Sequence, residues 1–309
     1  MKNPLFYAKI LLFGEYGIIQ NSKGLTIPYN FYKGTLKFGD ANQKQKDSSK
    51  VLKDFCKYLK ENSQILEDLN LDLEAFQKDL QNNLYFDSDI PQGYGVGSSG
   101  ALVAAIYHRY AQNKFDPSSI KKDQIALLKN SFGLMECFFH GKSSGVDPLI
   151  CYLNIPLLIH SQNEIDKVGL PGESQSGKGA VFLLNSGEIG HTAPLIDYFF
   201  DKMKNEGFRK TLKEEFIKYN DACIESFLKG DFSPLFGDLK KLSTWVMVHF
   251  KPMIPKPMLQ VWQQGLSTND YYLKLCGSGG GGYILGFTRD YQKAEKLLKA
   301  YHPQKIYSF

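Results

Sequence analysis

A glycine-rich segment at the end of the first third of the chain has the residue types of a phosphate-binding loop. Residues 90–102 read IPQGYGVGSSGAL, and residues 101–106 are apolar and typical of a helix start. Glycines let the backbone turn and approach a ligand closely, so several N–H groups and the positive end of a helix converge on one anion. We therefore expect a phosphate cradle, with the candidate binding residues Pro91, Gly93, Gly95, Gly97, Ser98, Ser99 and Gly100.

Other classes of glycine-rich loop fit this segment less well. Residues 95–100 match G-x-G-x-x-G, but residues 86–91 before them are not the buried apolar strand that a dinucleotide-binding fold requires. The motifs that accompany the glycine loop of a protein kinase are absent from the sequence. A Walker A loop ending at residues 141–143 would need a glycine where the chain has Glu136. If this segment is considered alone, the alternative to a phosphate-binding loop is a glycine-rich turn that only begins a helix.

Three more segments place charged residues or glycines in apolar surroundings. Residues 6–13 are strand-like, and Lys9 is their only charged residue. Apolar residues recur at helical spacing over residues 125–139, with Glu136 on or near the apolar face, and Asp147 follows within the stretch HGKSSGVDP. Near the C-terminus, a strand-like run leads into the glycine-rich residues 277–282.

Each of these features also has an ordinary structural explanation. Lys9 could be an outward-facing charge on an edge strand. Glu136 could be a surface glutamate, and an aspartate before a proline, such as Asp147, commonly starts a turn. Serine is a favoured N-cap, which would account for Ser99. Residues 277–282 could form a flexible hairpin turn.

Taken in this order, the motifs resemble those of the GHMP kinases, the small-molecule kinases of galactose, homoserine, mevalonate and phosphomevalonate. The resemblance covers essentially the whole chain, and residues 136–147, with H-G-x-x-S-G-V-D, look most like mevalonate kinase. It implies an α+β fold with two domains: a ribosomal protein S5 domain 2-like domain at residues 1–165 and a ferredoxin-like α+β sandwich at residues 166–309. It also implies ATP and Mg²⁺ as cofactors.

The resemblance implies a role for each candidate residue. Asp147 is the catalytic base or orienter of the acceptor hydroxyl, and Lys9 beside it keeps the carboxylate ionised. Ser99 and Glu136 bind Mg²⁺, an ion that prefers hard oxygen ligands. The nucleotide-binding residues also include Gly279 and Gly280. The expected substrate contacts are Glu15, Tyr16, Gly145, Thr192 and Gly277.

Two departures from the family pattern concern the acceptor. The family usually has histidine where this chain has Tyr16. A family segment of the N-T-K-x-x-R-x-T type appears as residues 185–192, NSGEIGHT, which keep Thr192 and lack both basic residues. The resemblance therefore implies that a phosphate or carboxylate contact normally made there has moved or is missing.

The composition fits an ordinary globular enzyme. With 309 residues, 43% of them hydrophobic and 22% charged, the chain can bury two sizeable cores. The net charge of +5 comes from scattered basic residues, so we expect no nucleic-acid partner. No apolar run approaches the roughly 20 residues that span a bilayer, and no signal peptide begins the sequence, so we expect no membrane association. Five cysteines without paired spacing indicate a reducing, cytoplasmic environment. A homodimer is possible, because family members are often dimers.

Hydrophobic periodicity and turn residues predict alternating helices and strands. The expected strands are residues 6–13, 25–38, 83–86, 180–184, 272–276, 283–287 and 305–309. The expected helices are residues 51–59, 65–80, 100–110, 125–139, 208–228, 236–250 and 290–301. Residues 163–179, with a proline and four glycines, are the best candidate for a domain junction.

The function that the resemblance implies is ATP-dependent transfer of the γ-phosphate to the primary hydroxyl of mevalonate. One alternative is a GHMP kinase with another acceptor, such as phosphomevalonate or a sugar. Another is a non-catalytic ligand-binding or regulatory protein with the same fold. The presence of Lys9, Ser99, Glu136 and Asp147 together argues against this last alternative, because binding alone does not need Asp147.

Overall fold

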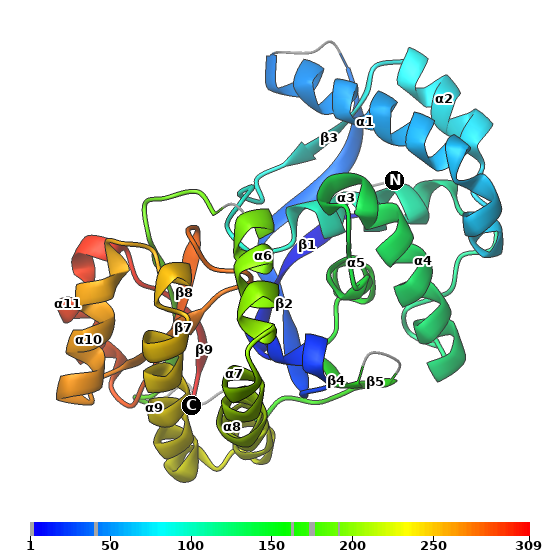
Figure 1. Ribbon diagram of the computed structural model, residues 1–309. Coiled ribbons are helices and arrows are strands. Elements are labelled where there is room, and N and C mark those ends of the chain that lie inside the picture. Colours follow the sequence, from blue (N-terminus) through cyan, green and yellow to red (C-terminus); the bar gives the residue numbers. More distant parts are fainter. Residues whose placement is uncertain (1–2, 40–42, 162–163, 173–176, 191) are drawn as a thin grey trace.

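The computed structural model describes residues 3–39, 43–161, 164–172, 177–190 and 192–309, without the side chains of residues 43–45, 65, 66 and 192. Two antiparallel sheets, one from each half of the chain, are covered by helices (Figure 1). This arrangement confirms the predicted α+β class.

The first sheet comes from the N-terminal half of the chain. Its central strand, β2 (Gly24–Phe38), pairs with β1 (Phe6–Phe13), β3 (Leu84–Ser88) and β4 (Leu157–Ser161). The edge strand β5 (Glu164–Lys167) pairs with β4. β5 spans residue 165, where the sequence predicts the first domain to end, so the division into residues 1–165 and 166–309 stays a proposal.

Five helices and two short 3₁₀ segments complete this half. α3 (Ser98–Tyr110) and α5 (Val146–Leu153) both pack on β1 and against each other, and α4 (Lys122–His140) packs on both of them. Nine of the 13 residues of α3 and seven of the eight residues of α5 are buried, as expected for largely apolar helices. The remaining segments are α1 (Gln43–Glu61), α2 (Leu73–Gln81), η1 (Gly17–Gln20) and η2 (Ser63–Leu69).

The second sheet has the strand order β7-β8-β6-β9. Its strands are β6 (Ala180–Asn185), β7 (Tyr272–Leu275), β8 (Tyr283–Thr288) and β9 (Gln304–Ser308). Its helices are α6 (Thr192–Met203), α7 (Glu206–Thr211), α8 (Lys218–Lys229), α9 (Phe232–His249), α10 (Met258–Thr268) and α11 (Tyr291–Leu297), with short segments η3 (Leu212–Ile217), η4 (Lys251–Met253) and η5 (Lys299–Tyr301).

The two halves share one hydrophobic core. The ring of Phe13, at the end of β1, stacks on Phe287 of β8 with 5.4 Å between the ring centroids. Beside this contact, Asp221 of α8 accepts hydrogen bonds from the Ser22 hydroxyl (2.9 Å) and the Lys23 backbone N–H (3.1 Å). Apolar and polar contacts therefore both hold the end of β1 against the second half.

Most predicted elements are confirmed, and the differences have physical reasons. The predicted elements do not include α5, α6, α10, β4 or β5. The single helix predicted at residues 65–80 is in fact η2 and α2, separated by Asn70 in the left-handed conformation. The helix predicted at residues 208–228 is continuous but contains π-helical turns at η3.

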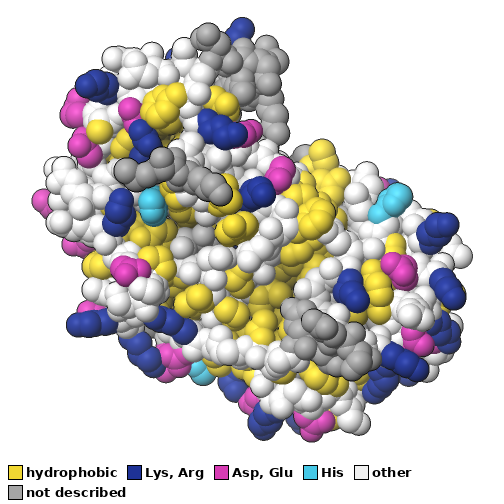
Figure 2. All heavy atoms as spheres, turned by 180° about the vertical axis from the view of Figure 1, so that it is seen from behind, with side chains coloured by type: hydrophobic (Ala, Val, Ile, Leu, Met, Phe, Trp, Pro, Cys, Tyr) yellow, Lys and Arg dark blue, Asp and Glu magenta, His cyan; other side chains and the backbone are white. Residues whose placement is uncertain are grey.

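The surface shows no segregation of charge on the face drawn in Figure 2. Apolar side chains gather in the middle of that face, and Lys and Arg side chains are interspersed with Asp and Glu around it (Figure 2). Within the described ranges, none of the helices has the length and apolar character needed to cross a membrane.

The helices α3 and α5 pack closely at Gly100, and this contact predicts a sensitive position. A Cβ on Gly100 would lie 2.8 Å from the backbone C of Asp147 and the N of Pro148. Gly100→Ala should therefore push α5 away from α3 and lower the free energy of unfolding in urea by about 1–3 kcal/mol.

Gly237→Ala is the matched control, because Gly237 is exposed inside α9 and a Cβ there meets nothing within 4 Å. This change should stabilise the protein by roughly 0.5–1 kcal/mol. Equal effects of the two substitutions would refute the close packing at Gly100.

Candidate functional site

A cleft of about 350 Å³ lies where β1, the glycine-rich loop, the end of α4, the start of α5 and the β7–β8 loop meet. It brings together twelve of the predicted site residues: Lys9, Glu15, Tyr16, Gly93, Gly95, Gly97, Ser98, Ser99, Glu136, Asp147, Gly277 and Gly279. Pro91 lines an adjoining cavity of about 860 Å³. Gly100, Gly145 and Gly280 line neither space, and the side chain of Thr192 lies outside the described part of the chain.

An ion pair between a buried lysine and a partly exposed aspartate lies in the cleft. The Lys9 ammonium is 2.9 Å from a carboxylate oxygen of Asp147, with side-chain exposures of 4% and 38%. Burial alone would lower the pKa of Lys9, but the Asp147 charge and hydrogen bond outweigh it and raise that pKa above its usual value. Lys9 is therefore a buried cation and not an exposed charge on an edge strand.

Asp147 lies in the first turn of α5, so it does not start an isolated turn, which was the ordinary explanation for an aspartate before a proline. Gly145 caps this helix in the left-handed conformation (φ 75°), and Pro148 is tolerated in the first turn because no backbone N–H is needed there. The positive end of the helix favours the Asp147 carboxylate. A Cβ on Gly145 would lie 1.8 Å from the backbone oxygen of Lys129, so only glycine fits at this cap.

Glu136 is the second carboxylate of the cleft, and it is 4% exposed. It accepts hydrogen bonds from the hydroxyls of Ser99 (2.8 Å) and Ser143 (2.5 Å). Burial, together with repulsion from Asp147, raises the pKa of Glu136 to about 7, although the two hydroxyls and Lys9 oppose this shift. Glu136 is thus not a surface glutamate, and its environment favours a bound cation.

The sequence did not single out two of the polar groups around Glu136. Ser143 donates to its carboxylate, and His140 Nε2 lies 3.0 Å from the Ser99 hydroxyl. Both belong to the HGKSSGVDP stretch. This motif indicated a functional site here, but it did not identify these two residues as partners of Ser99 and Glu136. Ser99 is the second residue of α3, and its hydroxyl donates to Glu136. The N-cap of α3 is therefore Gly97 and not Ser99.

The oxygen atoms around Ser99 and Glu136 fit Mg²⁺. This ion takes one or two carboxylates and completes its shell with substrate phosphates and water. In the described ranges, no group of three or more His, Cys, Asp or Glu side chains could hold a metal ion without such help. The donor set therefore matches a metal that arrives with a phosphate ligand.

The glycine-rich loop has the geometry of a backbone cradle. Gly93, Gly95 and Gly97 all have positive φ (76°, 76° and 81°), a conformation that side chains disfavour. Close approach is a second reason for glycine, since a Cβ on Gly97 would lie 2.8 Å from Cγ of Lys9. The Lys9 backbone N–H donates to the Val96 oxygen (3.0 Å), so β1 positions both the loop and the ammonium.

The β7–β8 loop packs its backbone against the glycine-rich loop. A Cβ on Gly95 would lie 2.5 Å from the Cys276 oxygen. The N–H groups of Gly280 and Gly282 donate to Met253 (2.6 Å) and Glu188 (2.6 Å) backbone oxygens. The hairpin predicted from the sequence is present, and these contacts hold its loop against the cleft.

Glu15 and Tyr16, the predicted substrate contacts, have partners within the protein. Both carboxylate oxygens of Glu15 are 2.6 Å from Nζ of Lys274, in a pair with exposures of 7% and 5%. The Tyr16 hydroxyl donates to the Ser278 backbone oxygen (2.7 Å), and its backbone has a positive φ of 61°. Lys274 lies in the strand-like run before residues 277–282, and the sequence predicted no role for it. Its buried partner, Glu15, is far away in the sequence and reaches Lys274 only because the end of β1 lies beside β7 in the fold.

The buried pair predicts that Lys274 is more important for stability than surface lysines. Lys274→Met would leave the Glu15 charge buried without its partner and should lower the free energy of unfolding by about 3–5 kcal/mol. The double variant Glu15→Gln/Lys274→Met should recover a large part of this loss in the same urea titration.

Lys241→Met is the control, because the Lys241–Asp238 pair is on the surface. It should change the free energy of unfolding by less than about 1 kcal/mol. A Lys274→Met variant as stable as this control would show that the pair does not hold the two halves together.

Comparison with known proteins gives a family and a fold. Residues 52–154 match the family described as GHMP kinases N terminal domain. The L. major mevalonate kinase in complex with R-mevalonate has a TM-score of 0.63 and 14% identity, over 97% of this chain and 90% of that one. The Streptococcus pneumoniae phosphomevalonate kinase in complex with phosphomevalonate and AMPPNP has a TM-score of 0.65 and 12% identity, over 100% and 99%.

The Lactococcus lactis galactokinase complexed with galactose has a TM-score of 0.61 and 10% identity, over 98% of this chain and 93% of that one. Comparison with curated protein sequences gives no match. At these identities the solved structures establish the fold. Residues 52–154 therefore match the GHMP kinase N-terminal domain, and the chain has the overall fold of the solved GHMP kinases.

Proposed function

We propose that this protein is an ATP-dependent kinase that transfers the γ-phosphoryl group to the primary hydroxyl of mevalonate. The observation that carries the proposal is the Lys9–Asp147 pair at 2.9 Å, which faces a glycine cradle and the Ser99–Glu136 oxygen atoms in one cleft. The adjoining cavity of about 860 Å³ is of a size that suits a nucleotide.

The reaction follows from what each group can do. The acceptor hydroxyl donates its proton to Asp147 while its oxygen forms a bond to the γ-phosphorus, and the bond to the β-phosphate oxygen breaks to release ADP. The Lys9 ammonium holds the Asp147 carboxylate in place through their ion pair. Ser99 and Glu136 would hold Mg²⁺, which when bound neutralises charge on the phosphate oxygens. The backbone N–H groups of the glycine-rich loop orient the phosphates.

The choice of mevalonate rests on the similarity of residues 136–147 to mevalonate kinase and on the fold shared with the L. major enzyme. Phosphomevalonate or a sugar is the second candidate, because the fold is shared equally with kinases of those substrates. Two departures from the family pattern support this second candidate: Tyr16 stands where the family usually has histidine, and residues 185–192 lack both basic residues. A cytoplasmic location and a homodimer complete the proposal.

A coupled ADP-release assay tests the proposed function. The purified protein should release ADP with ATP, Mg²⁺ and mevalonate, and more slowly with phosphomevalonate, homoserine or galactose. ADP release only with one of these other acceptors would support the second candidate. The absence of ADP release with every acceptor would support a non-catalytic protein.

Asp147→Asn tests the proton acceptor. This change keeps the size of the side chain and removes its basicity, so kcat should fall by at least about 100-fold, while the Kd for ATP, measured by calorimetry, stays the same. Asp197→Asn is the control, because Asp197 is exposed on α6 and lines neither cavity. An unchanged kcat in the Asp147 variant would remove Asp147 from this role.

Glu136→Gln tests the metal site. The amide keeps an oxygen that accepts from Ser99 or Ser143 but loses the charge that attracts Mg²⁺. The Mg²⁺ concentration for half-maximal rate should therefore rise by about 10- to 100-fold, with kcat partly recovered at high Mg²⁺. An unaltered metal dependence would contradict the assignment of Glu136 as a ligand.

A further inference from the structure

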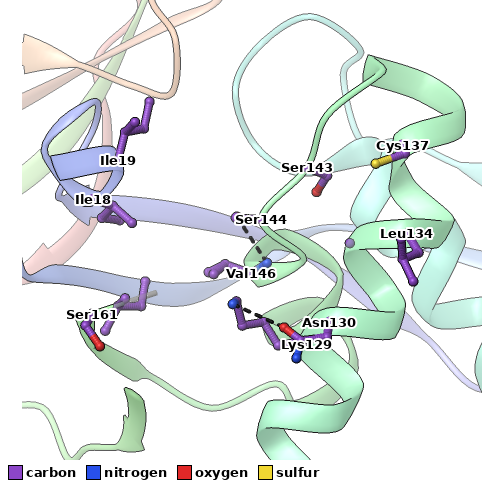
Figure 3. A pocket seen from close by; sticks show the side chains of 12 residues that line it. Ile18, Ile19, Lys129, Asn130, Leu134, Cys137, Ser143, Ser144, Val146 and Ser161 are labelled. Carbon is purple, nitrogen blue, oxygen red and sulfur yellow. Dashed lines mark hydrogen bonds between the residues drawn. The ribbon is translucent and has the colours of Figure 1, made fainter. Parts of the chain in front are cut away.

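A second cavity of about 510 Å³ continues from the cleft on the side away from the glycine-rich loop. The two spaces share four wall residues: Ile18, Ile19, Ser143 and Ser144. Figure 3 shows Ile18 and Ile19 on the η1 side and α4 on the opposite side. A ligand that places a hydroxyl at Asp147 can therefore extend into this second cavity without crossing the protein backbone.

The walls of the second cavity are mainly apolar. Ile18, Leu134, Val146 and Ile159 contribute hydrocarbon surface. Of its lining side chains, all of which are among the described residues, Lys129 is the only charged one. In Figure 3 the Lys129 side chain points from α4 into the cavity, and its ammonium makes a long hydrogen bond of 3.4 Å to the Asn130 amide oxygen.

The fold sets the distance between Lys129 and the reacting groups. Lys129 and Glu136 are seven residues apart on α4, so they lie on the same side of the helix, two turns and about 10 Å apart along its axis. The flexible lysine side chain can shorten this gap. Lys129 is partly buried, and this burial lowers the pKa of its ammonium. An anion beside such a cation is bound more strongly than at an open surface.

We propose that Lys129 is a specificity residue that binds the carboxylate of the acceptor, at the far end of a short hydrocarbon chain from the reacting hydroxyl. The hydrocarbon part lies against Ile18, Ile19 and Val146. This inference rests on the proposed kinase function, since it assigns the other end of the same acceptor. The proposed binding depends on the position and the charge of the Lys129 ammonium.

The first test compares acceptors in Lys129 variants. In Lys129→Met, the KM for mevalonate should rise by about 10- to 100-fold, as expected for loss of a hydrogen bond to a charged group. The kcat and the KM for ATP should stay close to those of the wild type. Lys129→Arg should restore most of the affinity. The uncharged amide of mevalonate should react equally with the wild type and Lys129→Met.

Two further comparisons sharpen this test. Lys213→Met is the matched control, because Lys213 is exposed in η3 and lines neither cavity. Phosphomevalonate keeps the carboxylate and carries its phosphate at the reacting end, so Lys129→Met should raise its KM by about the same factor as the KM for mevalonate. An effect on phosphomevalonate alone would contradict binding of the carboxylate. An unchanged KM for both acids in Lys129→Met would overturn the inference and leave the kinase function intact.

The second test does not need turnover. Cys137 lines the second cavity and is partly exposed, whereas the other four cysteines are buried. Alkylation of Cys137 by iodoacetamide, followed by peptide mass spectrometry, therefore reports occupancy of the cavity. Mevalonate should slow this alkylation in the wild type and in Lys213→Met, but not in Lys129→Met.

The two tests separate the possible failures. Protection of Cys137 without ADP release would uphold Lys129 as an anion-binding residue and contradict the kinase function. ADP release would uphold the kinase function. If Lys129→Met then changed neither the KM nor the protection of Cys137, the role of Lys129 as an anion-binding residue would be contradicted. Preference for galactose over both acids, or no protection by either acid, would overturn the inference.

Discussion

The burial of one ammonium determines how the cleft is built. Lys9 is inside the first half of the molecule, on a strand covered by helices, and an unpaired charge there would cost several kcal/mol. The carboxylate of Asp147 at 2.9 Å removes most of this cost and thereby fixes the start of α5 beside β1. Gly97 and Gly100 are part of the same arrangement, because side chains at these positions would collide with Lys9 and with α5.

The second half of the molecule closes the cleft through backbone contacts and a second buried pair. The Glu15–Lys274 pair joins the residues after β1 to β7, and the glycine-rich loops of the two halves touch through their backbones. Glycines at these contacts bring N–H groups from both loops close to the space where phosphates would lie. A single shift of β1 would therefore disturb Lys9, Glu15 and the cradle together.

The sequence predicted well what depends on local pattern. Periodicity located β1, α3 and α4, and the glycines of residues 90–102 indicated the cradle before any partner was known. It missed α5 because seven of the eight residues of this helix are buried, so no polar face marks its period. Pairings between distant residues, such as Glu15 with Lys274, have no local signature. The same holds for Lys129, because its importance comes from the cavity around it.

The most direct test of the account is a double-mutant cycle on the central pair, with kcat for the best acceptor as the readout. Lys9→Met and Asp147→Asn should each lower kcat strongly. Their combination should lower kcat no further than the more damaging single change, since both remove one functional unit. Effects that multiply in the double variant, or a Lys9→Met variant with wild-type kcat, would contradict the claim that this pair carries the chemistry.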